Sequence, residues 1–278
     1  MSDGAARTAA FRQLHESGCF VMPNPWDAGS ARALASLGFP ALATTSAGFA
    51  WSTGRPDNSV GLDETLVHLR LIVNAVDLPV NADFQDGYAL EPEAVATNVG
   101  LAVGTGVAGL SIEDFSGDPA DPLIDPVLAV ERIAAARAAI DATGTGVVLT
   151  ARSEGFVWGR PDLAGTIRRL TAYAEAGADC VYAPWLTSVD QVSAIVSAVS
   201  PTPVNLLVNT PFTTLAEAAS LGVRRISVGG MLAKTAWRGF LQAAREIRDE
   251  GTFTGFADLP DLNALLQPFV GGSGSQEN

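Results

Sequence analysis

Short apolar runs alternate with longer helical patterns eight times along this chain, and this regularity constrains the fold more than any other feature. The runs cover residues 19–24, 41–46, 78–83, 109–114, 146–152, 179–184, 202–209 and 224–229. Parallel strands that are buried on both faces read as such apolar runs, and intervening helices imply parallel pairing. Eight strand–helix units therefore predict an α/β fold, the (β/α)8 or TIM barrel.

The helical patterns cover residues 29–38, 62–75, 91–103, 125–140, 163–177, 188–198, 213–221 and 231–249. A shorter helical pattern at 259–269 is left over, and its Leu and Phe spacing suits packing onto another surface, such as that of a neighbouring subunit. We therefore expect a barrel over 1–250, a C-terminal helical extension over 251–270 and a flexible tail over 271–278. A doubly wound open sheet is the alternative, although no Gly-rich dinucleotide fingerprint follows the first strand.

Composition narrows the class of partner. The 278 residues are 47% hydrophobic and carry a formal charge of −13, which argues against nucleic acid, because that partner needs a basic face. An anionic substrate remains possible, since one or two focused arginines outweigh the net charge locally. Cys19 and Cys180 lie in apolar runs, which favours reduced thiols and a cytoplasmic location. We find no signal peptide and no apolar stretch of membrane-spanning length, so no membrane partner is expected.

Polar residues gather at the C-terminal ends of the predicted strands, where barrels of this kind carry their active sites. In order along the chain, these residues are Asp27, Thr45, Ser46, Asp83, Gln85, Asp86, Glu113, Asp114, Arg152, Glu154, Asn209 and the pair Gly229-Gly230. Carboxylates on adjacent strands suit Mg²⁺, which keeps several waters and takes one or two direct carboxylates. Arg152 can bind a substrate carboxylate through two parallel hydrogen bonds.

Several of these residues also have a purely structural interpretation. Asp114 and Glu154 each follow a stronger candidate by one or two residues, and we expect them to support their loops. His15 and His68 fall within helical patterns, where packing is the expected role. The Gly229-Gly230 pair is equally compatible with a phosphate cradle and with a plain tight turn.

Four stretches make the chain, from about residue 8 to 250, resemble the isocitrate lyase/phosphoenolpyruvate (PEP) mutase superfamily, in particular its small bacterial members. They are "TTSAGFAWSTGRPD" (44–57), "PVNADFQDGY" (79–88), "AGLSIED" (108–114) and "VVLTARSE" (147–154). The resemblance implies a (β/α)8 barrel whose last helix is swapped between subunits, usually in a homotetramer. The surplus C-terminal helix agrees with that expectation.

The resemblance also assigns roles to residues. Mg²⁺, or Mn²⁺, would be bound directly by Asp83 and through the outer shell by Asp57, Gln85 and Glu113. The carboxylate of a 2-keto acid would be held by Thr45, Ser46, Ala47 and Arg152, with Asn209 also contacting the substrate; Arg152 and Asp57 would be the catalytic residues. Gln85 stands where the family has the second aspartate of an Asp-x-Asp pair, so we expect weaker metal binding unless Asp86 compensates.

The loop 115–126 departs from the family pattern, because it lacks the Lys, Cys and His of the isocitrate and methylisocitrate lyases. The Asn-containing gating loop of a phosphonomutase is also absent, and "APW" (183–185) replaces a usual Glu, so Trp185 is expected to narrow the pocket. The leading hypothesis is a Mg²⁺-dependent C–C lyase that cleaves a small 2-keto acid through an enolate, with oxaloacetate decarboxylation first. The alternatives are a C–P bond enzyme of the phosphonopyruvate hydrolase or PEP mutase type, and a non-catalytic 2-keto acid binding protein.

Overall fold

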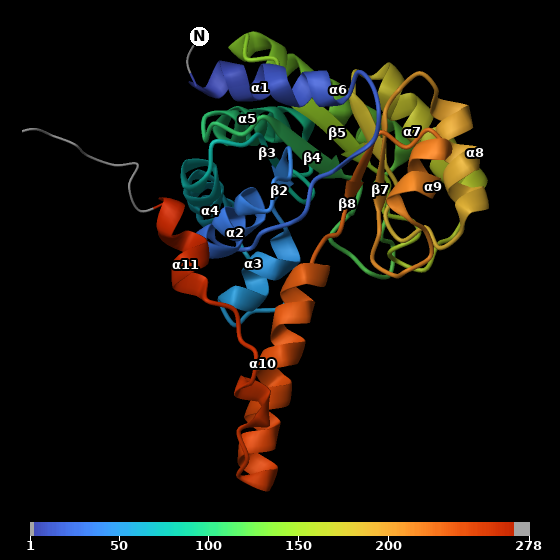
Figure 1. Cartoon of the computed structure of the whole chain (residues 1–278). Coiled ribbons are helices and arrows are strands. Elements are labelled where there is room, and N and C mark those ends of the chain that lie inside the picture. Colours follow the sequence, from blue (N-terminus) through green and yellow to red (C-terminus); the bar gives the residue numbers. More distant parts are fainter. Residues whose placement is uncertain (1–2, 270–278) are drawn as a thin grey trace, which may run out of the picture.

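The computed structural model describes residues 3–269, which form a barrel of eight parallel strands surrounded by helices (Figure 1). The strands are β1 (Phe20–Val21), β2 (Leu42–Ala43), β3 (Val80–Asp83), β4 (Gly109–Glu113), β5 (Val148–Arg152), β6 (Cys180–Tyr182), β7 (Val204–Leu207) and β8 (Arg225–Ser227). Their order in the sheet is β1-β8-β7-β6-β5-β4-β3-β2. A 3.1 Å hydrogen bond from Ala43 N to Pro23 O joins the two ends of the sheet, so the predicted barrel is confirmed.

The predicted helices of the barrel wall all form, within a few residues of their expected ends. They are α2 (Ala28–Ser36), α4 (Leu62–Ala75), α5 (Pro92–Val103), α6 (Pro126–Thr143), α7 (Leu163–Glu175), α8 (Val189–Val199) and α9 (Leu215–Ser220). In α4, Leu66, Leu69, Ile72 and Val73 are buried, which is the spacing of one helical face. Asp27 caps α2 by accepting from Ser30 N at 2.7 Å. None of the helices described here is long and apolar enough to span a membrane.

Two helices lie outside the predicted ranges: α1 (Asp3–Leu14), which ends just before His15 and was implied only by the helical pattern assigned to that residue, and α3 (Ser46–Ser52), which was not predicted. Helix α1 lies across one end of the barrel, at the opposite end of the molecule from the projecting helix α10 (Met231–Glu250) (Figure 1). There Phe11 is fully buried and meets Phe20 edge to face at a centroid distance of 6.2 Å. This apolar contact closes the N-terminal end of the barrel and leaves the other end for the pocket.

The interior of the barrel is more polar than the apparently continuous apolar runs suggested. Asn81, Ser111, Thr150, Asn205 and Arg225 are all buried on the inward side of their strands. Arg225 links strands across this interior: it donates to Asn205 Oδ1 on the neighbouring β7 at 2.9 Å and to Thr150 Oγ1 on β5 at 2.7 Å. Many apolar positions of the strands face outward, toward the helices, while Ala43 and Leu207 line the pocket inside the barrel.

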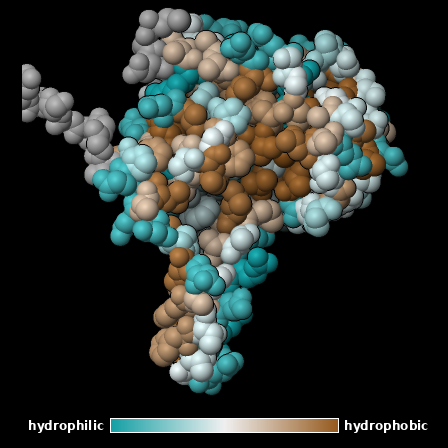
Figure 2. All heavy atoms as spheres, in the orientation of Figure 1, coloured by the Kyte–Doolittle hydropathy of each residue, from teal (hydrophilic) through white to brown (hydrophobic). Residues whose placement is uncertain are grey.

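Helix α10 follows β8 as expected, but it projects away from the barrel instead of completing its wall (Figure 1). Of its residues only Ala233 is buried. The short helix η1 (Thr254–Phe256) folds back on α10, and Glu246 accepts from the backbone of Thr254 and Gly255. Figure 2 shows apolar residues exposed over the barrel in this view and along the projecting part.

The chain then returns to the barrel through α11 (Leu262–Leu266) and η2 (Gln267–Phe269), the surplus helix that the sequence predicted. Helix α11 packs against α2, and the Arg32 guanidinium lies 5.8 Å from the centroid of the Phe269 ring. The predicted tail at 271–278 lies outside the described residues.

Candidate active site

A pocket of about 220 Å³ opens at the C-terminal ends of the strands. Eight of the nine predicted site residues line it: Thr45, Ser46, Ala47, Asp57, Asp83, Glu113, Arg152 and Asn209. Trp185 lines its rim, as expected, and is 52% exposed. The ninth predicted residue, Gln85, lines a separate small cavity instead.

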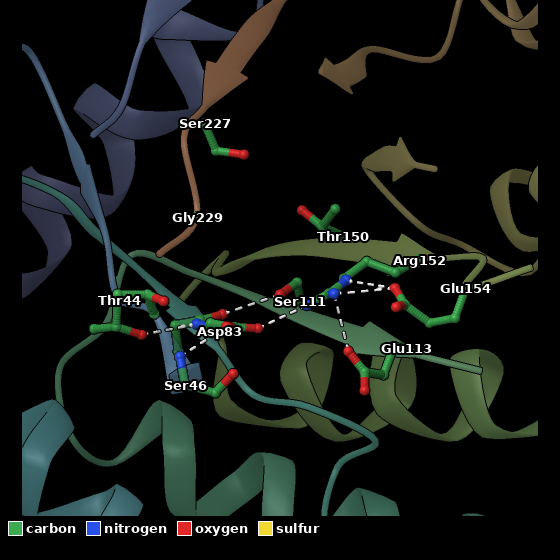
Figure 3. A network of polar contacts seen from close by, with 12 residues as sticks. Thr44, Ser46, Asp83, Ser111, Glu113, Thr150, Arg152, Glu154, Ser227 and Gly229 are labelled. Atoms are coloured by element: carbon green, nitrogen blue, oxygen red, sulfur yellow. Dashed lines mark hydrogen bonds and ion pairs between the residues drawn. The ribbon is translucent and has the colours of Figure 1, made fainter. Parts of the chain in front are cut away.

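Arg152 is the centre of the polar network in the pocket (Figure 3). Its Nη1 lies 2.7 Å from Asp83 Oδ1, its Nη2 lies 3.0 Å from Glu113 Oε2, and its Nε donates to Glu154 Oε1 at 3.0 Å. The guanidinium also lies 5.1 Å from the centre of the Tyr182 ring. One positive charge therefore faces three carboxylates, each from a different loop or strand end.

Burial, together with this excess of negative charge, shifts the pKa values of the carboxyls in the network. Burial, followed by Glu154 and Asp83, raises the pKa of Glu113 well above its ordinary value, although Arg152 opposes the shift. Burial likewise raises the pKa of Glu154 to about 7, again against the effect of Arg152. Burial alone would lower the pKa of Arg152, but the surrounding carboxylates outweigh it and raise that pKa. A further cation would be stabilised in this cluster.

The start of α3 holds Asp83 in place. Asp83 Oδ2 accepts from Ser46 N at 2.9 Å, and Asp83 N donates to Thr44 Oγ1 at the same distance. Thr45 is the N-cap of α3 and accepts from Gly48 N at 3.2 Å. A Cβ atom at Gly48 would lie 2.6 Å from the Thr45 side chain, so this close approach requires glycine.

Gln85 occupies a tight turn directly after β3. Its φ is +46°, and Gly87 N donates to Phe84 O across the turn at 2.9 Å. The buried Gln85 side chain lines a cavity of about 10 Å³ together with Asp83 and Tyr88, a space for about one water. Asp86, the residue considered as a substitute for Gln85, accepts from Tyr88 N at 2.8 Å and does not line the pocket.

Asp57 and Asp114 differ in what they face. Asp57 is exposed as a whole, but its carboxyl faces the pocket, where loss of water and then the charge of Asp83 raise its pKa. Asp114 supports the loops, as expected: its carboxylate accepts from Tyr173 Oη at 2.6 Å, from Arg169 Nη1 at 3.2 Å and from Glu154 N at 2.8 Å. Glu154 was expected only to support its loop, but its side chain also lines the pocket.

The Gly229-Gly230 pair and the two histidines have structural roles. Val228 N and Gly229 N both donate to Asn24 Oδ1 at 2.9 Å, so the Gly229 amide is engaged in bracing the turn, although both glycines line the pocket. His68 is buried and stacks on Phe49 at 3.8 Å. Neither His68 nor His15 lines the main pocket, so both pack as expected.

The loop that follows β4 is closed on itself. Phe115 and Leu123 form an antiparallel bridge, Ser116 N donates to Pro122 O at 2.9 Å, and Ile124 N donates to Asp114 O at the same distance. The Phe115 ring stacks on Trp158 at 4.3 Å, and it is Trp158 that lines the pocket. No residue of 115–126 lines the pocket in this structure.

The donor set fits one particular kind of metal site. Within residues 3–269 no three His, Cys, Asp or Glu side chains are close enough together to chelate a metal ion. Asp83 as the one direct carboxylate, with Asp57 and Glu113 acting through water, instead suits Mg²⁺, which dehydrates reluctantly and accepts hard oxygen ligands. The superfamily typically uses Mg²⁺, so the residues fit that ion.

Sequence reasoning did not assign every residue that lines the pocket; among those it left out are Trp51 and Lys234, and Glu154 was expected only to support its loop. Glu154 had a detectable signal, because side chains alternate along a strand and Thr150, Arg152 and Glu154 therefore share one face. Lys234 had another, because it is the only lysine in the chain. Trp51 lies on the unpredicted helix α3 and carried no such signal.

Comparisons with known proteins identify the family of the chain. The family profile described as phosphoenolpyruvate phosphomutase matches residues 11–248, and the chain belongs to the PEP mutase/isocitrate lyase superfamily. That superfamily comprises C–C lyases and mutases that bind small keto-acid substrates.

Among curated relatives, an uncharacterized protein of Mycobacterium tuberculosis is 35% identical and the match covers 92% of this chain and 96% of that protein. The 2-methylisocitrate lyase of Escherichia coli is 30% identical (77% and 75% covered), and the oxaloacetate decarboxylase of Bradyrhizobium sp. is 31% identical (69% and 68%). Among solved structures, a Burkholderia cenocepacia protein described only as a lyase or mutase has a TM-score of 0.93 at 46% identity (96% and 98% covered). An oxaloacetate acetylhydrolase bound to its product oxalate has a TM-score of 0.84 at 28% identity (96% and 95%).

Proposed function

We propose that this protein is a Mg²⁺-dependent lyase that cleaves a C–C bond of a small 2-keto acid through an enolate, with oxaloacetate decarboxylation as the leading reaction. The observation that carries the proposal is the closed loop after β4. This loop brings no acid to the pocket, and its sequence contains no Lys, Cys or His. Departing CO₂ needs no proton when the bond breaks, whereas a departing carbanion does.

The pocket offers matching groups for the keto-acid head. Arg152, with Thr45, Ser46 and Ala47 at the start of α3, would hold the carboxylate, and Asn209 would contact the substrate from the rim. Asp83 would hold Mg²⁺ directly, with Asp57 and Glu113 through water. The bound ion would supply charge stabilisation to the keto oxygen as it becomes an enolate.

The enolate must afterwards receive a proton. Because burial raises the pKa of Glu154 to about 7, this carboxyl is partly protonated at neutral pH. It lines the pocket and bonds to Arg152, so it joins solvent water as a candidate donor. The names of two relatives, an oxaloacetate decarboxylase and an oxaloacetate acetylhydrolase, lend the choice of oxaloacetate further support.

We also propose that the chain works as a homotetramer in the cytoplasm. The sequence assigned the exchange between subunits to the surplus helix at 259–269, but α11 packs against α2 of its own barrel, so we propose that the projecting helix α10 (Figure 1) is the exchanged element. Its large apolar residues support this: Phe240 is 60% exposed and Ile247 38% exposed. They line a groove of about 380 Å³ with Phe256 and Leu259 that lies away from the barrel. Sedimentation equilibrium of the protein and of a Phe240→Asp variant tests the assembly, and an unchanged mass for the variant would argue against the exchange.

A metal-dependent substrate panel tests the reaction. Purified protein is incubated with Mg²⁺ and, separately, oxaloacetate, 2-methylisocitrate and phosphonopyruvate, and products are measured by mass spectrometry. We expect pyruvate from oxaloacetate, loss of activity in Asp83→Asn, and normal activity in Asp190→Asn, an exposed aspartate on α8. Consumption of phosphonopyruvate alone would favour the C–P enzyme, and oxalate binding without any turnover would favour the binding protein.

A further inference from the structure

Lys234 is the only lysine among the 17 basic residues of the chain, and it lies at the active-site pocket. It stands in the first turn of α10, directly after the Gly229-Gly230 turn. Its Nζ lies 5.3 Å from the centre of the Trp51 ring, which is cation–π distance. The function described above leaves this cation without a role.

The position of Lys234 is fixed relative to the substrate-binding residues. A Cβ atom on Gly230 would lie 2.8 Å from the Trp51 ring and 3.7 Å from the Ala47 Cβ, so these three residues pack closely. Ala47 follows Ser46, whose backbone N–H binds Asp83. The ammonium group of Lys234 is thus connected by direct packing to the wall that would hold the keto-acid head.

Helix stability does not explain a lysine at this position. The helix has no side-chain N-cap and no acidic residue in its first turn, and the positive end of a helix dipole disfavours a cation there. Within residues 3–269, no carboxylate lies within ion-pair distance of Lys234. An anion bound in the pocket would supply both the missing partner and the reason for the charge.

We propose that Lys234 is the specificity-determining residue that binds the second anionic group of the substrate, the distal carboxylate of a 2-keto di-acid. This inference rests on the proposed function, in which Arg152 and the α3 wall take the first carboxylate. The attraction between Lys234 and the distal carboxylate is strongest before the reaction, because a carboxylate that leaves as CO₂ loses its charge. Loss of Lys234 should therefore raise KM and leave kcat unchanged or higher.

The single lysine allows a direct test that does not depend on turnover. Reductive methylation with ¹³C-formaldehyde keeps the charge and labels two amines, Lys234 and the terminal α-amine, which serves as an internal control. With Mg²⁺ present, malate should shift the Lys234 methyl signal while the α-amine signal stays in place. Oxalate, which has the head group without the distal arm, should bind with a smaller shift.

Affinities of variants complete the test. Lys234→Met should weaken malate binding about 10- to 100-fold, the range for losing one charge-assisted hydrogen bond, and leave oxalate within about twofold. Lys234→Arg should retain most of the affinity, and Arg238→Met, one turn further along α10 and outside the pocket, should match the parent protein. If Lys234→Met binds malate as well as the parent does, the role of Lys234 is overturned while the proposed function stands. If neither malate nor oxalate binds with Mg²⁺, both fail together.

Discussion

The two sides of the pocket are built in different ways. On the β3–β5 side, the buried Glu113 and Glu154 and the half-buried Asp83 and Arg152 form a network in which each charged group has a partner (Figure 3). On the side of β6 and α10, Trp185 and Lys234 are exposed and rest on loops and on a helix that leaves the barrel. We infer that the buried side fixes the common chemistry of the superfamily, while the open side determines which substrate is accepted.

Removing the central cation should have the largest effect. Arg152→Met leaves Glu113 and Glu154 buried without their counter-charge, which should cost about 3–5 kcal/mol of unfolding free energy at pH 8. Activity should be lost as well. Urea denaturation measures the loss of stability, and pyruvate release measures the loss of activity. If the free energy of unfolding fell by less than about 1 kcal/mol, the β3–β5 side would not differ energetically from the open side of the pocket.

Asp114→Asn tests the support behind the buried side. Asp114 is 2% exposed and accepts from Tyr173, Arg169 and the backbone of Glu154, so the neutral amide should lower stability by about 2–4 kcal/mol. Because Asp114 accepts from the backbone N–H of Glu154, the substitution should also displace Glu154 and lower kcat. Thermal denaturation and steady-state kinetics check this, with Asp190→Asn as the exposed control.

Glu154→Gln tests the buried negative charge of Glu154 through the pH dependence of the free energy of unfolding. The folded pKa of Glu154 is about 7 and the ordinary value is 4.5, so between these values the native state binds more protons than the unfolded state. Stability of the metal-free protein should therefore fall as pH rises through this window. The glutamine variant should be about 1–3 kcal/mol more stable than the parent at pH 8, with the difference vanishing near pH 4.5. Denaturant titrations with EDTA measure it; a difference that does not change with pH contradicts the assignment.

Gln85→Asp tests position 85, where this chain has glutamine in place of the second aspartate of the family's Asp-x-Asp pair. It adds a carboxylate beside Asp83, and one more negative charge near Mg²⁺ should raise metal affinity about tenfold, or about 1.4 kcal/mol. Isothermal titration with Mg²⁺ checks this. Equal affinity would mean that Gln85 serves only the small cavity.

Trp185→Ala should have the smallest effect on stability, because the side chain is half exposed on the open side. The free energy of unfolding should change by less than about 0.5 kcal/mol. The preference among keto acids of different length should broaden, however, because the rim becomes wider. Competition assays with longer keto acids measure this, and unchanged selectivity would place the specificity elsewhere.

The fold was predictable because the sequence shows a regular pattern of eight apolar runs that alternate with helical segments. The runs are apolar because each strand is buried between the helices and the barrel interior. Helix α3 was missed because seven residues are too few for a periodic signal, and its start depends on the Thr45 cap. The direction of α10 could not be predicted, since an amphipathic pattern shows that a face will be covered but not by what. The position of Gln85 depends on a turn with positive φ at a non-glycine residue, which sequence patterns do not reveal.

The candidate site was predictable wherever a residue ends a strand, as Asp83, Glu113 and Arg152 do. The site was less predictable at Glu154, the next residue after Arg152 that faces into the barrel. Glu154 lies beyond β5 and faces the pocket because Asp114 holds its backbone N–H. Alternation along the strand indicates that Glu154 shares the face of Arg152. The contact that holds it there joins residues 40 positions apart, so no local pattern reveals that contact.

The polar interior of the barrel has a consequence for the thermodynamics of unfolding. Unfolding this chain exposes Asn, Ser, Thr and Arg side chains from the barrel centre, where many barrels expose branched apolar ones. Polar exposure lowers the heat capacity of the unfolded state and apolar exposure raises it. The heat-capacity change should therefore fall below the usual figure of about 12–15 cal/mol/K per residue. The stability curve would then be flatter, and the protein would keep its stability over a wider range of temperature.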